Sequence, residues 1–259
     1  MEILRFTLKG QHAFYKKPEV NSYFYFTYGN IHKVALLGMF GAILGYGGYT
    51  QMKGYGKEKK SGELFESYPE FYDKLKAVKV SILPSNKYKN GVIPKKIQSF
   101  NNSVGYASKE LGGNLIVKEQ WLESPEWEIC VLLDCEEALK LKESIINHRC
   151  IFYPYLGKND HPADLLNIRV EKAEKIAFDE GRLDCLAPET KVELADLDYE
   201  DKEELNAFGT FQYKEALPMG MDGWTNQYIL EKMIYTDEFL NAEQEPVYQL
   251  SDQKKIIFY

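Results

Sequence analysis

The stretch Trp127–Asn147, WEICVLLDCEEALKLKESIIN, decides the fold class. Its first eight residues, WEICVLLD, form a short apolar run typical of a buried strand. From Glu136 to Asn147 the apolar residues recur at helical spacing, which predicts an amphipathic helix. The same pair, a strand followed by a helix, is expected near the N-terminus.

The remaining elements of residues 1–176 complete this pattern. They are a strand Ile3–Leu8, a helix Ile31–Leu44 capped by Asn30, a short helix Pro69–Ala77, and strands Val78–Leu83, Ile151–Leu156 and Leu166–Ile176. The resulting order is β, α, hairpin, β, α, β. This order predicts an α+β fold of the ferredoxin-like (RRM-like) class with a long insertion.

The insertion, residues 84–125, is polar and basic. Gly112 and Gly113 are expected to turn a hairpin between Ile97–Tyr106 and Asn114–Leu122. The first arm, IQSFNNSVGY, has few large apolar residues and contributes little to a core. We therefore expect the hairpin to project from the body and to grip a ligand, the alternative being a partly ordered surface loop.

Residues 177–259 are predicted to form an acidic linker and a smaller β-rich C-terminal part. The linker is assigned because residues 179–205 hold 11 acidic side chains. Phe208–Tyr213, Tyr228–Tyr235 and the terminal KKIIFY have strand-like composition. The acidic segment either meets basic protein partners or keeps the chain in solution.

The net charge of −7 conceals an asymmetry, because residues 1–100 carry +9 and residues 101–259 carry −16. A basic half beside an acidic half indicates an anion-binding surface on one side. The four cysteines lack metal-ligand spacing and are expected to be reduced, as in the cytoplasm. The longest apolar run, Val34–Leu44, is too short to cross a bilayer, so no membrane association is expected.

Three glycines, Gly38, Gly41 and Gly45, share one face of the N-terminal helix and predict a close approach there by a sheet backbone or by RNA. The Gly-rich loop that follows carries four lysines but lacks the P-loop pattern and follows a helix rather than a strand. The lysines are Lys53, Lys57, Lys59 and Lys60. A phosphate contact and a mobile loop are both open for this segment.

Several motifs, in this order, resemble the Cas-five family of the CRISPR-associated RAMP superfamily, with subtype I-B the most similar. They are LRFTLKG, FYKKP (14–18), NSYFYFTY (21–28), HKVALLGMFGAILGY (32–46), KEQWLESPEWEICVLL (118–133) and YPYLGKNDHPADL (153–165). The resemblance covers residues 1–176. It implies a ferredoxin-like RAMP domain with a hairpin thumb, without metal or cofactor.

The resemblance also implies a function and partners. The chain would bind and cap the 5′ handle of the crRNA in a Cascade complex and join the large subunit to the backbone subunit. Target DNA would be met through the complex. The residues expected to contact RNA are Lys16, Lys17, Asn21, Ser22, Tyr23, Lys33, Lys95, Lys96 and Lys118.

One branch of the family consists of metal-independent endoribonucleases that use a Tyr, a Lys and a thumb His. Here Lys118 with Tyr46 or Tyr49 could fill two of these roles, but Glu119 follows the lysine and the thumb holds no His. We therefore expect a non-catalytic subunit, with pre-crRNA processing as the alternative. A scaffold whose acidic half matters more than its RNA contact is a third hypothesis.

Overall fold

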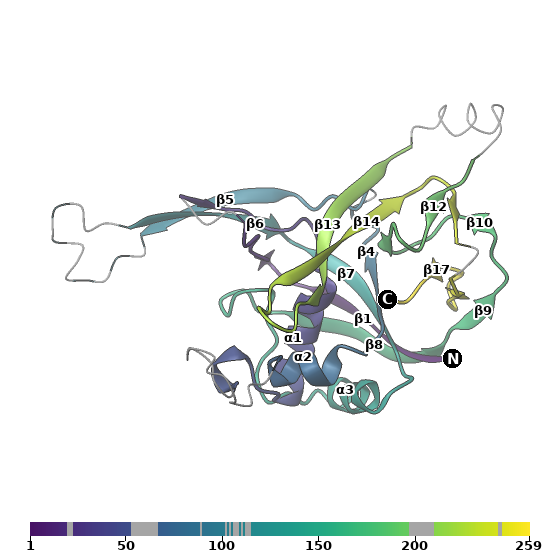
Figure 1. Cartoon of the computed structure of the whole chain (residues 1–259), viewed down its shortest axis with the longest axis horizontal. Helices are drawn as coiled ribbons and strands as arrows, with labels where there is room; N and C mark the ends of the chain where they lie inside the picture. The colour runs from purple at the N-terminus through teal and green to yellow at the C-terminus, as the bar shows by residue number, and fades with distance from the viewer. Residues whose placement is uncertain are drawn as a thin grey trace.

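A four-stranded antiparallel sheet with strands in the order β4–β7–β1–β8 lies at the centre of the fold (Figure 1). The computed structural model describes residues 1–19, 23–52, 67–88, 90–101, 103, 105, 109, 111, 115–196, 210–242 and 245–259. The strands are β1 (Glu2–Lys9), β4 (Val80–Pro84), β7 (Glu126–Leu132) and β8 (Asp164–Lys172). Along the chain, helix α1 (Lys33–Leu44) comes between β1 and β4, and α3 (Glu136–Ile146) comes between β7 and β8. The expected α+β class is confirmed.

The two faces of this sheet pack against different parts of the chain. On one face Leu4, Phe6 and Leu8 join a core with α1 and α3, where the rings of Phe6 and Phe40 lie 6.5 Å apart. On the other face Ile3 joins a second core made with strands from the C-terminal part. Strict alternation along β1 is what allows a single strand to serve both cores.

Helix α1 is apolar on nearly every side because it packs against other elements on most of its surface. It packs against the sheet, against α2 (Glu70–Leu75), against α3 and against β13 (Gln212–Met221). Its cap differs from the prediction: Nδ1 of His32, not Asn30, accepts the backbone N–H of Ala35 at 3.1 Å. Asn30 is instead buried, where its Oδ1 accepts a hydrogen bond from the indole N–H of Trp127 at 2.9 Å.

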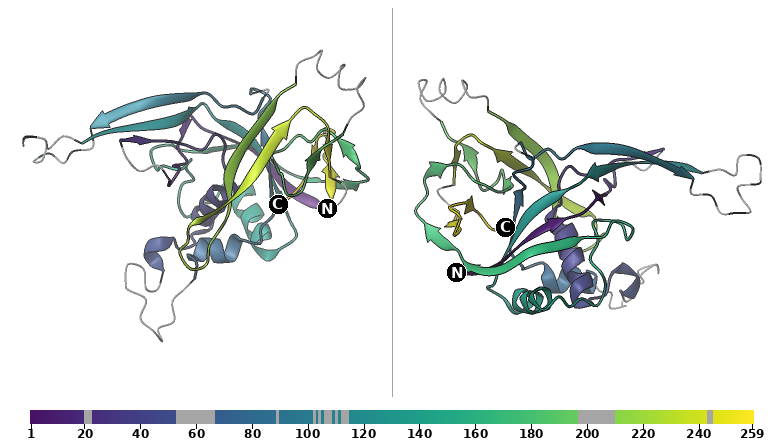
Figure 2. Two further views of the ribbon diagram at one scale, coloured as in Figure 1. Left: turned by 45° about the horizontal axis from the view of Figure 1, so that its top comes forward. Right: turned by 180° about the vertical axis from the view of Figure 1, so that it is seen from behind.

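A second sheet carries a hairpin arm that projects from the body in all views (Figures 1 and 2). Strands β5 (Lys95–Asn101) and β6 (Ile116–Glu123) pair antiparallel, and β2 (His12–Ala13) and β3 (Phe24–Tyr25) pair with β6 at its base. The predicted turn Gly112-Gly113 and the lysine-bearing loop at residues 53–60 lie outside the described residues.

The C-terminal part is rich in short strands. Besides β13, these are β9 (Glu174–Ile176), β10 (Glu180–Gly181), β11 (Ala187–Pro188), β12 (Glu193–Leu194), β14 (Tyr228–Thr236), β15 (Leu240–Asn241), β16 (Val247–Gln249) and β17 (Lys255–Ile256). The β13–β14 ribbon contacts α1, while β16 and β17 pack on the opposite face of the central sheet. The C-terminal part therefore contributes to both cores.

A buried ion cluster ties the last residues of the chain to the central sheet. Arg5 is fully buried and its guanidinium bonds to Glu128, Glu171 and Asp252 at 2.7, 2.8 and 2.6 Å. Lys254 also contacts Glu128, at 2.5 Å. An arginine placed inside a fold needs such a set of partners, because an unpaired buried charge is strongly destabilising.

The predicted strand Ile151–Leu156 is wrong. This segment runs past the C-terminal end of α1, where the N–H groups of Ile151 and Phe152 donate to the carbonyls of Ile43 and Ala42 at 3.0 and 3.1 Å. Pro154 has no N–H to give to a ladder. The apolar side chains of Ile151 and Phe152 stay exposed, at 68% and 60%, instead of entering a core.

Candidate nucleic-acid interface

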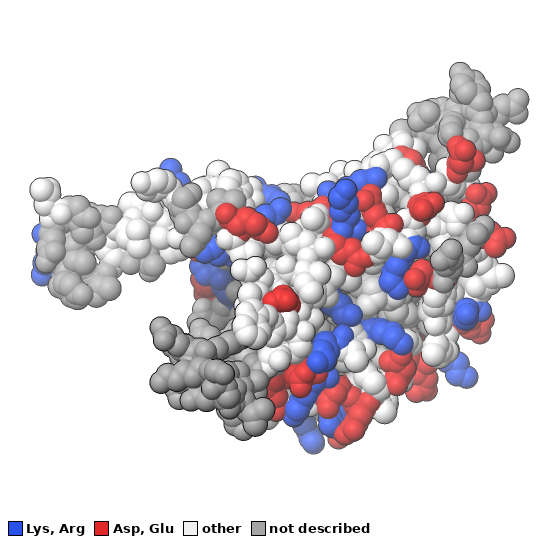
Figure 3. Space-filling view, in the orientation of Figure 1, with Lys and Arg blue, Asp and Glu red and all other residues white. Residues whose placement is uncertain are grey.

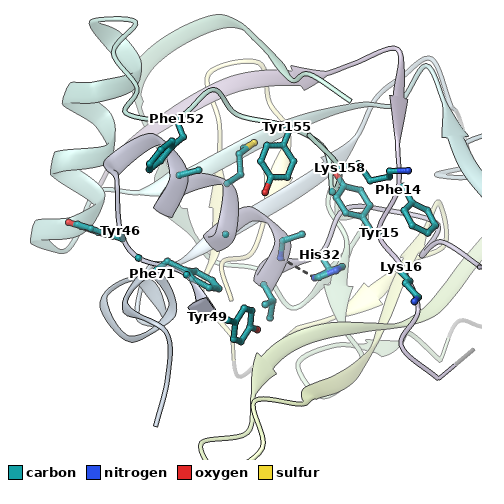
Figure 4. A pocket seen from close by; sticks show the side chains of 18 of the residues that line it. Phe14, Tyr15, Lys16, His32, Tyr46, Tyr49, Phe71, Phe152, Tyr155 and Lys158 are labelled. Carbon is teal, nitrogen blue, oxygen red and sulfur yellow. Dashed lines mark hydrogen bonds between the residues drawn. The ribbon is translucent and has the colours of Figure 1, made fainter. Parts of the chain in front are cut away.

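A cavity of about 910 Å³ runs along one side of α1 (Figure 4). Its walls come from the N-terminal loop, α1 and the turn after it, α2, β14 and the segment 152–158. Most of the large side chains that line it are aromatic. They are Phe14, Tyr15, Tyr46, Tyr49, Phe71, Phe152, Tyr155 and Tyr228.

The glycine face of α1 explains why the cavity exists. Gly38 and Gly45 line the cavity, and a Cβ on Gly38 would meet no atom closer than 3.9 Å. Gly41 faces α2 instead, since a Cβ there would lie 2.4 Å from Cβ of Phe71. The predicted close approach is therefore made at Gly41 by a second helix, while Gly38 leaves space.

Two lysines lie at the end of the cavity nearest the arm (Figure 4). Nζ of Lys16 lies 4.1 Å from the centre of the Tyr25 ring. Nζ of Lys158 bonds to the largely buried carboxylate of Glu119 at 2.9 Å and lies 5.4 Å from the ring of Trp121. Aromatic side chains thus line the cavity at both ends, and the exposed Lys16 makes one end cationic, which suits a ligand with a flat ring and an anionic group.

Gly157 sets the position of Lys158. Its φ is +85°, and a Cβ there would lie 1.9 Å from the carbonyl oxygen of Phe14. Only glycine lets the two backbones pass this closely. The crossing brings Lys158 beside β6, where Glu119 and Trp121 hold it.

The predicted RNA contacts do not form a single cluster. Lys16 is exposed and lines the cavity. Lys17 does not line the cavity, and its Nζ lies 2.7 Å from Glu215 on β13. Lys33 is half-buried, and burial together with the charges of Lys191 and Lys79 lowers its pKa.

The arm lysines lie near the base of the hairpin. Burial lowers the pKa of Lys95, which has Glu215 and Lys17 as charged neighbours. The pKa of His12 is lowered mainly by burial and further by the charge of Lys96. Lys118 is exposed on β6, opposite Ser99 and Phe24.

Three predicted contacts belong to the aromatic NSYFYFTY motif. Tyr23 is 91% exposed, and Asn21 and Ser22 lie outside the described residues. Phe24 and Phe26 pack edge to face at 4.6 Å. Tyr106, also considered for stacking, is outside the described residues as well.

Residues that the sequence reasoning missed line much of the cavity. Phe152 and Tyr155 lie in the segment predicted to be a strand, Lys158 lies in a motif noted for the family resemblance, and His32 was not singled out. A run of aromatic residues followed by Gly-Lys was the available signal. Nothing local indicates that it lies against α1.

Charge is mixed rather than uniformly basic over the lower part of the body. Figure 3 shows lysines and arginines interspersed with acids there, where α2 and α3 lie. Lys74 pairs with Glu70, Lys76 with Asp73, and Lys140 with Glu136. These lysines are therefore engaged by local acids.

Of the tyrosines considered for RNA cleavage, Tyr46 is engaged by an acid, and the hydroxyl of Tyr49 donates to Sδ of Met221 at 3.4 Å. The hydroxyl of Tyr46 bonds to Glu137 on α3, and burial together with this bond raises the pKa of Tyr46 to about 12. Lys118 neighbours the cavity-lining Glu119 along β6, so its side chain points to the other face of the strand.

The described part of the chain has neither a cluster of metal-ligating side chains nor a membrane-spanning helix. Its His, Cys, Asp and Glu side chains form no group of three or more that could hold a metal ion. Its helices include none long and apolar enough to span a membrane.

Neither the protein-family models nor the curated proteins give a match to this sequence. Among solved structures, a chain of a CRISPR RNA-guided surveillance complex is similar, with a TM-score of 0.50 and 13% identity over 97% of this chain and 92% of that one. A CRISPR protein from Archaeoglobus fulgidus gives 0.46 and 10%, over 99% of this chain and 98% of that one.

A chain of a type III-B Cmr-beta complex bound to cognate target RNA and AMPPnP gives 0.48 and 10%, over 93% and 86%. At these identities the likeness is one of fold. The chain thus has the fold of a protein found in a CRISPR surveillance complex.

Proposed function

We propose that this chain is an RNA-binding structural subunit of a CRISPR interference complex, of the Cas-five kind, and that it holds the 5′ handle of the guide RNA. The observation that carries the proposal is the cavity along α1, lined by aromatic side chains and cationic at one end, at the base of a projecting hairpin. Single-stranded RNA is recognised by this combination of stacking surfaces and lysines.

The sheet topology supports the family within this proposal. Two helices that follow β1 and β7, with the strand order β4–β7–β1–β8, match a ferredoxin-like domain. The β5–β6 arm lies between β4 and β7, at the place where the family resemblance implies a thumb. The fold shared with a chain of a surveillance complex is consistent with both.

In the proposed complex, phosphates lie at the cationic end and bases lie along the aromatic walls. Lys16 neutralises a phosphate, which contributes affinity without sequence preference, whereas the ammonium group of Lys158 is already paired with Glu119. Lys96, which pairs with Trp121 across the arm, extends the basic path onto the arm, while Lys118 lies on the opposite face of β6. Lys17 contributes less, because Glu215 already occupies its ammonium group.

The proposed partners are the backbone subunit and the large subunit, with target DNA reached through the assembled complex. Exposed apolar side chains at Ile151, Phe152 and Tyr153 support a role inside an assembly, since adjacent exposed apolar side chains mark interaction surfaces. The proposed role is binding, not cleavage, because Tyr46 is engaged by Glu137.

The test is equilibrium binding of handle RNA and unrelated RNA by the assembled complex at several salt concentrations. Lys16→Ala should weaken binding to all RNAs and reduce the salt slope by about 0.7 for one lost phosphate contact. Lys140→Ala, which alters an exposed lysine paired on α3, is the matched control and should change neither quantity. A wild-type complex that shows no preference for handle RNA would refute the proposal.

A further inference from the structure

His32 lies in the cavity wall, although only 3% of it is exposed and no step of the proposed function uses it (Figure 4). Its Nδ1 accepts the N–H of Ala35 at 3.1 Å, which fixes the tautomer. A neutral imidazole that accepts at Nδ1 carries its proton at Nε2. The ring therefore offers one hydrogen-bond donor besides the cap.

Three tyrosines surround this imidazole edge-on. The ring centres of Tyr15, Tyr28 and Tyr228 lie 5.8, 5.3 and 5.5 Å from that of His32. The hydroxyls of Tyr15 and Tyr28 are buried and have no hydrogen-bond partner among the described residues. Buried polar groups are almost always paired, so this part of the wall has hydrogen-bonding capacity to spare.

All four groups stay neutral at physiological pH. Burial lowers the pKa of His32 to about 3 and raises the pKa of Tyr15, Tyr28 and Tyr228 above the usual range of tyrosine. Lys17, whose Nζ lies 5.0 Å from the centre of the Tyr28 ring, is paired with Glu215 and has little charge left to replace the hydration of a phosphate. A neutral polar group on a flat ring is the chemistry that this pocket can take.

We propose that His32, with the hydroxyl of Tyr15, forms a neutral subsite that receives one unpaired RNA base and discriminates by its hydrogen-bonding edge. This inference rests on the proposed function. The phosphates of the same nucleotide segment stay near the exposed ammonium group of Lys16. The subsite selects the base, while Lys16 supplies sequence-independent affinity.

An aromatic wall favours a base over a bare sugar as the occupant. Tyr15 and Tyr228 both line the cavity on either side of His32, and a nucleobase has the flat face that such rings accept. A base edge that matches the donor of His32 is favoured. A mismatched edge leaves that donor buried and unpaired, which is the source of discrimination.

The substitution His32→Asn separates the two roles of this residue. Asparagine caps helices well, so the start of α1 is retained, but its short side chain cannot reach the position of Nε2. Tyr15→Phe removes only the hydroxyl. His148→Asn is the matched control, because His148 is exposed at the end of α3 and tolerates asparagine at its φ of 51°.

The measurement is binding of handle RNAs that carry each base, or no base, at one position at a time, by the assembled complex. The wild type should lose affinity roughly tenfold at one position for a wrong or missing base. His32→Asn should abolish this difference and leave the salt slope unchanged, and Tyr15→Phe should reduce it. His148→Asn should behave as wild type, and a deoxyribose at that position should cost little if the base is the group read.

Three results overturn the inference. One is a folded His32→Asn variant, checked by thermal unfolding, that retains full base discrimination. Another is a penalty that follows the 2′-hydroxyl instead of the base. The third is a wild-type complex that binds handle RNA tightly without preference at any position. A wild type that does not distinguish handle RNA from unrelated RNA refutes the proposed function itself, and the inference with it.

Discussion

At the scale of single residues, Arg5 holds three carboxylates against one face of the central sheet. Burial by itself would raise the pKa of Asp252, but the hydrogen bonds and charge of Arg5 outweigh it and hold the pKa at about 2. The pKa values of Glu128 and Glu171 are lowered in the same way against burial. The pKa of an aspartate in an unfolded chain is about 3.9.

A folded pKa below the unfolded one stabilises the fold at pH values above the unfolded pKa. This contribution should be lost as the pH falls from about 4 toward about 2. Asp252→Asn should therefore flatten the dependence of the urea midpoint on pH within that window. Asp73→Asn, in an exposed pair with Lys76, should retain the wild-type profile. Parallel profiles for wild type and Asp252→Asn would contradict the assignment.

At the scale of elements, two glycines on one helix have opposite roles. A Cβ on Gly41 would clash with Phe71 of α2, so Gly41→Ala should lower the free energy of unfolding by about 1–3 kcal/mol. Gly38 faces open space, so Gly38→Ala should raise stability by about 1 kcal/mol through helix propensity. Urea unfolding of both variants tests this, and equal effects of the same sign would refute the assigned contacts.

Gly38→Ala also changes the cavity without destabilising the helix. The added methyl group would point into the cavity wall without disturbing α2. The pair of variants thus separates a glycine needed for helix packing from one that keeps space for a ligand.

At the scale of the whole molecule, the chain should not cleave repeat RNA on its own. The candidate groups Tyr46 and Lys118 do not meet, and a tyrosine with a pKa of about 12 is a poor source of a base at neutral pH. Incubation of the purified protein with repeat RNA and a metal chelator should leave the RNA intact. A specific product that disappears with Lys118→Ala or Tyr46→Phe would move the chain to the endoribonuclease class.

Much of the central fold follows from local patterns. Alternation in β1 and the apolar run of β7 identify strands because each strand buries one or both faces. The amphipathic pattern of Glu136–Asn147 identifies α3, which ends at Ile146. The failed strand Ile151–Leu156 has the composition of a strand, but its N–H groups are taken by the end of α1.

The sequence by itself determined the order of elements in the α+β core and the place of the arm, since periodicity and turn residues act over short distances. Tertiary structure alone decided that His32 caps α1, that Glu215 takes Lys17, and that Lys158 reaches the cavity. These outcomes depend on which of several competing partners lies within a few ångströms after folding. Residues up to 198 positions apart, as Lys17 and Glu215 are, carry no local signal of such a choice.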